Sequence, residues 1–163
     1  MVSGWHITHL PVRVSGASRV WRIVDEVVVS WSEFRVEGFL LTPRPFRVLF
    51  IPGDAGVTVS TLGIEISERK TAERRSKHWR REVLKKQQQF KNRPVVDQTG
   101  RLHGRLKDFL FDERTLQLTH LIVSRGLMGD LLSGAYLVPV GEVTEMEPAA
   151  IKIFVPGEPF PMR

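Results

Sequence analysis

The sequence predicts an all-β protein built from two tandem small antiparallel β-barrels that are joined by a basic α-helix. Three observations lead to this fold class. Short apolar stretches with a period of two, separated by turn-forming residues, occupy both ends of the 163-residue chain. The first third repeats the apolar pattern of the last third, and a charged stretch without Gly or Pro lies between them. We place the barrels at residues 10–66 and 92–155, the helical linker at 67–91, and a Pro-rich tail at 156–163.

The stretch from Arg101 to Phe154 shows the strand pattern best. Its first strand carries alternating Leu and Asp side chains against Phe109 and Phe111. In the next strand, Leu116, Leu118, His120 and Ile122 are spaced by two, so we expect them to share one face. A glycine-containing loop and two further short apolar strands follow, which is typical of a small antiparallel barrel.

An internal repeat links the two ends of the chain. A shift of 82 residues places 19–41 over 101–123, with matching apolar positions, and after the central loop the shift becomes 87. There Ile51-Pro52 falls on Val138-Pro139, so the first copy has a central loop five residues shorter. A lone barrel of about 60 residues would be marginally stable. The copies therefore pack either on each other or on another chain, which leaves a homo-oligomer open.

The linker at 67–91 differs in composition from both barrels. It has ten Lys or Arg against three Glu, a net +7, while the whole chain is +6. It lacks Gly and Pro and is rich in helix formers, and Ser67 is placed to cap a helix start. The net basicity of the protein thus lies in this one segment.

Three interpretations of the linker compete. It is a solvated connector whose Trp79, Val83 and Leu84 pack on a barrel, or a surface for an anionic partner, or a membrane-surface helix. Its narrow apolar stripe argues against the last. An anionic partner would be RNA, DNA or an acidic protein. The candidate residues for that partner are Arg69, Lys70, Arg74, Arg75, Lys77, Trp79, Arg80, Arg81, Lys85 and Lys86.

The loop from Gly126 to Gly134 combines glycines with large apolar side chains. Such a loop either presents a contact surface for a protein partner or folds over the open end of the barrel and fills its core. The candidate partner residues in it are Leu127, Met128, Asp130, Leu131 and Leu132.

The sequence shows no pattern for catalysis, metal binding or cofactor binding. It has no Cys, which excludes disulfides and thiol chemistry, and it lacks the phosphate-loop, dinucleotide and nucleophile-elbow motifs. We therefore predict no catalytic residue, no metal and no cofactor. There is neither a signal-peptide pattern nor an apolar run long enough to span a membrane. We expect a cytoplasmic protein, for which attachment to a membrane would be peripheral and through a partner.

Four short motifs in the second barrel resemble the PRC-barrel family. They are G-x-L-x-D-F-L-F-D-x-x-T at 104–115, L-I-V at 121–123, G-L-M-G at 126–129 and L-V-P at 137–139. The loop departs from the family pattern, because Leu and Met stand in place of the usual aromatic residue. The first copy carries the resemblance mainly through the internal repeat.

The resemblance implies a binding function rather than a reaction. PRC-barrel domains occur in the cytoplasmic part of the photosynthetic reaction-centre H subunit and in a ribosome maturation factor, both of which dock on other macromolecules. Our leading hypothesis is a non-enzymatic adaptor that docks on a larger protein complex, including one peripheral to a membrane or a photosynthetic complex. The alternative is an RNA- or ribosome-precursor-binding factor that uses the basic helix at 69–91.

Overall fold

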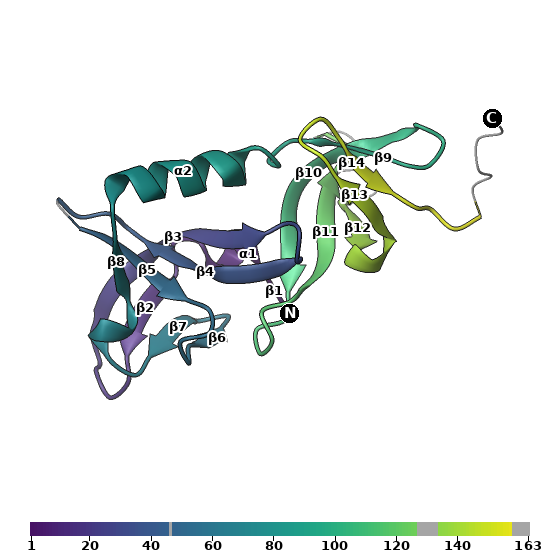
Figure 1. The fold of residues 1–163 in the computed structure, drawn as a ribbon. Helices are drawn as coiled ribbons and strands as arrows, with labels where there is room; N and C mark the ends of the chain where they lie inside the picture. Colours follow the sequence, from purple (N-terminus) through teal and green to yellow (C-terminus); the bar gives the residue numbers. More distant parts are fainter. Residues whose placement is uncertain (46, 127–133, 158–163) are drawn as a thin grey trace.

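The computed structural model describes residues 1–45, 47–126 and 134–157, which form two β-sheets and short helical elements (Figure 1). The first sheet contains β2 (Pro11–Val14), β3 (Val20–Ser30), β4 (Arg35–Leu41), β5 (Val48–Pro52), β6 (Thr58–Ser60), β7 (Gly63–Ile66) and β8 (Glu73–Arg75). The second contains β1 (Val2–Ser3), β9 (Pro94–Val96), β10 (Leu102–Phe111), β11 (Leu118–Ser124), β12 (Tyr136–Pro139), β13 (Val143–Met146) and β14 (Ile151–Ile153). The helical elements are α1 (Gly4–Ile7), η1 (Arg69–Thr71), α2 (Lys77–Gln88) and η2 (Val140–Glu142).

The strands of the two sheets follow the same order. The first sheet runs β6-β7-β2-β3-β4-β5-β8 and the second runs β13-β14-β9-β10-β11-β12, with β1 added beside β10. Each sheet contains one parallel pair, β2 with β7 and β9 with β14. The predicted β-rich fold is therefore confirmed, but two antiparallel barrels are not, because both sheets are mixed and neither is a closed barrel. Parallel neighbours are joined by long connections, and a period-two pattern does not reveal them.

The central pairs of the two sheets also share their register. Val24 faces Leu41 in the first sheet as Leu106 faces Val123 in the second, and a bulge follows at the same place in both. These residues are related by the shift of 82 found in the sequence. At β2 and β9 the shift is one residue larger, because Pro11 takes the place that Pro94 takes in the second sheet.

A bulge in the second sheet alters the predicted face of β11. Leu110 faces His120 but Phe111 faces Leu118, so one residue of β11 has no partner of its own. The bulge reverses the alternation of side chains along the strand. Leu121 and Val123 are fully buried, whereas His120 and Ile122, which we expected to share the face of Leu118, are only half-buried.

The two sheets share one hydrophobic core at the place where they meet. Phe39 from the first sheet and Phe111 from the second belong to one cluster and are both fully buried. Two backbone hydrogen bonds cross this junction, each 2.8 Å long. One runs from Val36 N to Leu116 O, and the other runs from Leu118 N to the carbonyl oxygen of Phe34 in the turn between β3 and β4. The two halves of the chain thus pack on each other.

The segment ahead of the first predicted barrel lies on the second sheet. Strand β1 pairs with the end of β10, and α1 follows at once. Ser3 caps α1 by accepting a hydrogen bond from His6 N at 2.9 Å. Residues 1–9 therefore bridge the two halves, which the sequence pattern does not indicate.

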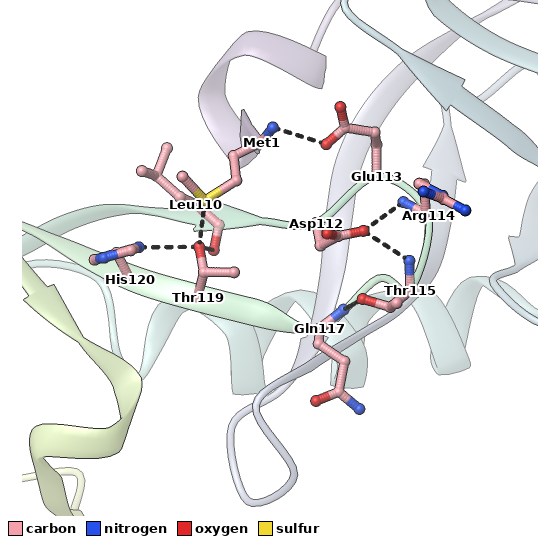
Figure 2. Close-up of polar contacts among 9 residues, drawn as sticks. All are labelled: Met1, Leu110, Asp112, Glu113, Arg114, Thr115, Gln117, Thr119 and His120. Atoms are coloured by element: carbon pink, nitrogen blue, oxygen red, sulfur yellow. Dashed lines mark hydrogen bonds and ion pairs between the residues drawn. The ribbon is translucent and has the colours of Figure 1, made fainter.

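The turn between β10 and β11 fixes this N-terminal segment (Figure 2). Asp112 Oδ1 accepts hydrogen bonds from the backbone N–H groups of Arg114 and Thr115 at 2.8 and 3.0 Å. These bonds lower the pKa of the Asp112 carboxyl. The Met1 ammonium lies 2.9 Å from Glu113 in the same turn.

The segment at 67–91 is not one helix. It contains the short turn η1, the edge strand β8, which pairs with β5, and then α2. Ser76 caps α2 by accepting a hydrogen bond from Trp79 N at 3.0 Å, so Ser76 takes the role predicted for Ser67. Pairing with a free strand edge overrides helix propensity, which is a weak preference.

Helix α2 packs on the outer face of the first sheet. Trp79, Val83 and Leu84 lie against a separate cluster that includes Val28 and Phe50, so the predicted packing residues are confirmed. The buried Gln87 side chain binds the backbone of β3 at its bulge, accepting from Val29 N at 3.1 Å and donating to Val29 O at 2.9 Å. The apolar side of α2 is therefore covered by the protein itself.

Candidate functional surfaces

The basic residues predicted to bind an anion lie beside the first sheet. They come from three elements, η1, β8 and α2, rather than from one helix face. Most of their side chains are exposed, and these are Arg69, Lys70, Arg74, Lys77, Arg81, Lys85 and Lys86. Lys70 forms an exposed ion pair with Glu68 at 3.5 Å, which contributes little to stability.

Three of the predicted anion-binding residues, Arg75, Trp79 and Arg80, instead hold α2 on the sheet. The Arg75 guanidinium lies 5.3 Å from the centroid of the Trp79 ring and also pairs with Glu73. Arg80 Nη2 donates to Asp25 Oδ2 at 2.8 Å, and both side chains are about one quarter exposed, at 26% and 29%. Their charges are engaged inside the fold, which leaves fewer cations available to a partner.

The structure adds arginines that lie outside the predicted linker. Burial lowers the pKa of the Arg22 guanidinium, and the nearby positive charges of Arg44, Arg47 and Arg69 lower it further. Arg44 and Arg47 flank a tight turn, which their backbones close with hydrogen bonds of 3.3 and 2.9 Å. Two arginines bracketing a turn at 44–47 are visible in the sequence, but only the fold brings them near η1.

The loop predicted to bind a protein partner lies largely outside the described residues. Leu127, Met128, Asp130, Leu131 and Leu132 all fall within 127–133, which the structure does not describe. The two interpretations of this loop, contact surface and barrel plug, therefore stay predictions.

Trp5 on α1 is the most exposed large apolar side chain among the described residues, at 78%. Its backbone N–H is held by both carboxylate oxygens of Asp108, at 3.1 and 3.2 Å. Burial raises the pKa of the Asp108 carboxyl, and hydrogen bonds from the Phe109 and Trp5 N–H groups oppose that rise. Trp5 was not among the predicted functional residues, because nothing in a sequence distinguishes an exposed Trp from a buried one.

A cavity of about 140 Å³ opens beside Trp5 at the junction of the two halves. Its walls come from α1, β3, α2 and β10, and they include Trp31, Asp108 and Phe109. Trp31 Nε1 is buried and has no hydrogen-bond partner among the described residues. The junction cavity is mainly apolar, with a carboxylate and an unpaired donor among its lining residues.

One ionisable pair of the second sheet is largely buried. His103 Nε2 lies 2.7 Å from Asp97 Oδ2, and the Asp97 side chain is fully buried. Asp97 Oδ1 also accepts hydrogen bonds from Thr99 and from Arg101 N, so this carboxylate organises the turn before β10. Among the described residues, no three His, Cys, Asp or Glu side chains gather in a way that could hold a metal ion.

Within the described part of the chain, no helix has the length and apolar character that a membrane crossing requires. No curated protein matches the chain in sequence. Residues 83–158 match the family model of the PRC-barrel domain. The match spans the end of α2 and strands β9 to β14, and it does not extend over the first sheet. Residues 83–158 are therefore similar to a PRC-barrel domain.

Proposed function

We propose that this protein is a non-enzymatic assembly module that docks on a protein partner in a larger complex through Trp5 and the junction cavity. The observation that carries this proposal is the exposure of Trp5 in a rigid setting. Tryptophan is enriched among the residues that dominate the energy of protein interfaces. An exposed indole beside an apolar cavity offers such a partner both an anchor and a recess.

The position of Trp5 is fixed by its neighbours. Gly4 packs so closely on Phe109 that an added Cβ would lie 2.4 Å from its ring. Ser3 caps the helix and Asp108 holds the Trp5 N–H, so α1 is bound at both its start and its side. A backbone held in place before binding loses little conformational entropy when a partner arrives.

Site-specific photocrosslinking in the native cell tests this proposal. A photoreactive amino acid replaces Trp5 in one variant and Leu102, an exposed residue of β10, in the control. We expect one defined protein to be crosslinked from position 5 and not from position 102. The same protein should copurify with the wild type and should no longer copurify with the Trp5→Ala variant. The same set of crosslinked proteins from both positions would refute a docking role for Trp5.

We also propose that residues 10–66 are a second copy of the PRC-barrel domain. The common strand order, the single parallel pair in each sheet and the matching bulges support this. Phe34 and Leu116, which are related by the shift of 82, both adopt a left-handed backbone with φ of 50° and 62°. Neither is a glycine, so the same uncommon conformation at matched positions favours a common origin.

The basic surface favours a second candidate function, which is the binding of RNA or a ribosome precursor. Exposed Arg and Lys side chains on η1, β8 and α2 would neutralise phosphates, and their binding would weaken steeply with salt. Copurification with and without nuclease tests it. We expect RNA to be recovered with the wild type and to be depleted when the exposed Arg74 and Arg81 become Glu. Equal recovery from this variant would contradict the second candidate function.

A further inference from the structure

A hollow of about 480 Å³ lies beside the start of β3. Its walls come from the β2–β3 connection, β3, the turn after β4 and η1. Among the described residues, four arginines line it, Arg19, Arg22, Arg44 and Arg69, and no acidic residue does. Three of them, Arg19, Arg44 and Arg69, have exposed side chains. The hollow is thus an open, positively charged recess, built by elements that are distant in sequence.

The arginines of this hollow lie near one another. The indole of Trp21 has the Arg22 guanidinium 4.8 Å from its centroid and the Arg69 guanidinium 5.7 Å from it. The pKa of Arg22 is lowered by its burial and by three neighbouring arginines. Within the described residues, Arg22, Arg44 and Arg69 form no ion pair. Their mutual repulsion would be relieved by a bound anion.

A second hollow, of about 320 Å³, adjoins the first. Arg44 lines both, and the second hollow continues to the first turns of α2 with Lys77, Arg80 and Arg81. Asp25 compensates Arg80, whereas Arg81 is exposed. The start of a helix also carries a partial positive charge. We name the two hollows together the arginine track, which has basic residues from β3 to α2 and shares Arg44 between its two parts.

We propose that the arginine track binds the phosphate backbone of a single RNA strand, with successive phosphates in the two hollows that share Arg44. This inference rests on the second candidate function and adds three arginines from outside the linker at 67–91, namely Arg19, Arg22 and Arg44, to its contacts. Arginine presents a planar fork that matches phosphate oxygens in a bidentate geometry, and every cation of the first hollow is an arginine.

The extent and composition of the track favour a strand over other anions. Two adjoining hollows exceed what one phosphate or one small metabolite would occupy. A membrane surface would need an apolar face beside the cations, but the apolar side chains of α2 are packed on the first sheet. The contacts are to the backbone only, so we expect affinity with little dependence on base sequence.

Fluorescence anisotropy with the full chain and a labelled single-stranded U20 RNA tests the track over a range of KCl concentrations. The test variant is Arg44→Gln/Arg69→Gln, and the matched control is Lys85→Gln/Lys86→Gln. Both remove two exposed charges, and only the first touches the track. We expect at least a tenfold loss of affinity for the test variant and about a twofold loss for the control. Loss of two phosphate contacts should also reduce the slope of log affinity against log salt by about 1.4.

Further arms of the experiment separate the possible failures. If the wild type binds the RNA and both variants weaken binding equally, the track is refuted while the second candidate function stands. If the wild type fails to bind the RNA at 100 mM KCl, both are refuted. Polyglutamate of matched length is the probe for an acidic protein, and binding as tight as that of RNA would also refute the proposal. The variant Arg44→Lys/Arg69→Lys should lie between wild type and the Gln variant, because it keeps the charge and loses the fork.

Discussion

Arg35 and Gln117 face each other in an antiparallel bridge that joins the two sheets. They are related by the shift of 82, so each occupies the same place in its own turn. Two hydrogen bonds of 2.8 Å flank this bridge, from Val36 N to Leu116 O and from Leu118 N to Phe34 O. The shift of 82 exchanges their donors and acceptors, so each half makes the same bond to the other. The halves of this chain therefore meet as two subunits meet in an isologous dimer.

A buried leucine in the turn between β10 and β11 gives the first prediction. Leu116 is 4% exposed, and it packs against both sheets in the shared core. We expect Leu116→Ala to lower the free energy of unfolding by about 2–5 kcal/mol, because a cavity replaces the side chain. Denaturant titration followed by circular dichroism measures this. Leu102→Ala, at a residue 57% exposed, should change the value by less than about 0.5 kcal/mol.

The buried amide of Gln87 gives a second prediction. The Gln87 side chain bonds both the N–H and the C=O of Val29 at the β3 bulge, where water has little access. Gln87→Ala removes both of these hydrogen bonds. We expect the free energy of unfolding to fall by about 1–3 kcal/mol, because buried polar groups are left unpaired. Hydrogen exchange of the Val29 amide should also become faster. The neighbouring exposed Gln88 provides the matched control, and Gln88→Ala should leave both measurements unchanged.

Glycine 104 gives a third prediction, from backbone geometry. Gly104 has φ of +142°, and an added Cβ would lie 2.3 Å from Ser124 O. We expect Gly104→Ala to cost about 1–3 kcal/mol from backbone strain, with the clash against β11 adding to it. The thermal midpoint measures the change. Gly141→Ala serves as control, because no atom lies within 4 Å of its added Cβ; a similar loss in both variants would contradict this account.

The Asp97 carboxylate predicts how stability depends on pH. Hydrogen bonds from Thr99, and then His103, lower its pKa below the ordinary value of 3.8. The unfolded chain thus binds the proton more readily, so this group stabilises the fold above pH 3.8 and loses its effect as pH falls toward the folded pKa. We expect Asp97→Asn to lower the thermal midpoint at pH 7 and to reduce its fall between pH 5 and about 2.

Asp112 gives a control for that titration, since its pKa is also lowered, by the N–H groups of Thr115 and Arg114. Asp112 lies in an exposed part of the β10–β11 turn, whereas the Asp97 side chain is fully buried. The midpoint at pH 7 should fall less for Asp112→Asn than for Asp97→Asn. If the thermal midpoint of Asp97→Asn fell with acid as steeply as that of the wild type, this would contradict the assigned role of the carboxylate.

The sequence by itself determined the β-rich architecture, the shift of 82 residues and the PRC-barrel resemblance that the match at 83–158 supports. It also determined which side of α2 packs, because Trp79, Val83 and Leu84 are spaced on one helical face. These features follow from local periodicity, which is written into the order of residues along the chain.

Only the tertiary structure decided the parallel pairs, the edge strand β8 and the bulge that reorients β11. It also decided that Arg75 and Arg80 are engaged within the fold while Arg22 and Arg44 join the basic surface. Strand pairing and charge clustering depend on which distant segments meet. The free energy of those long-range contacts outweighs local propensity. The periodicity of the sequence does not show which distant segments will make them.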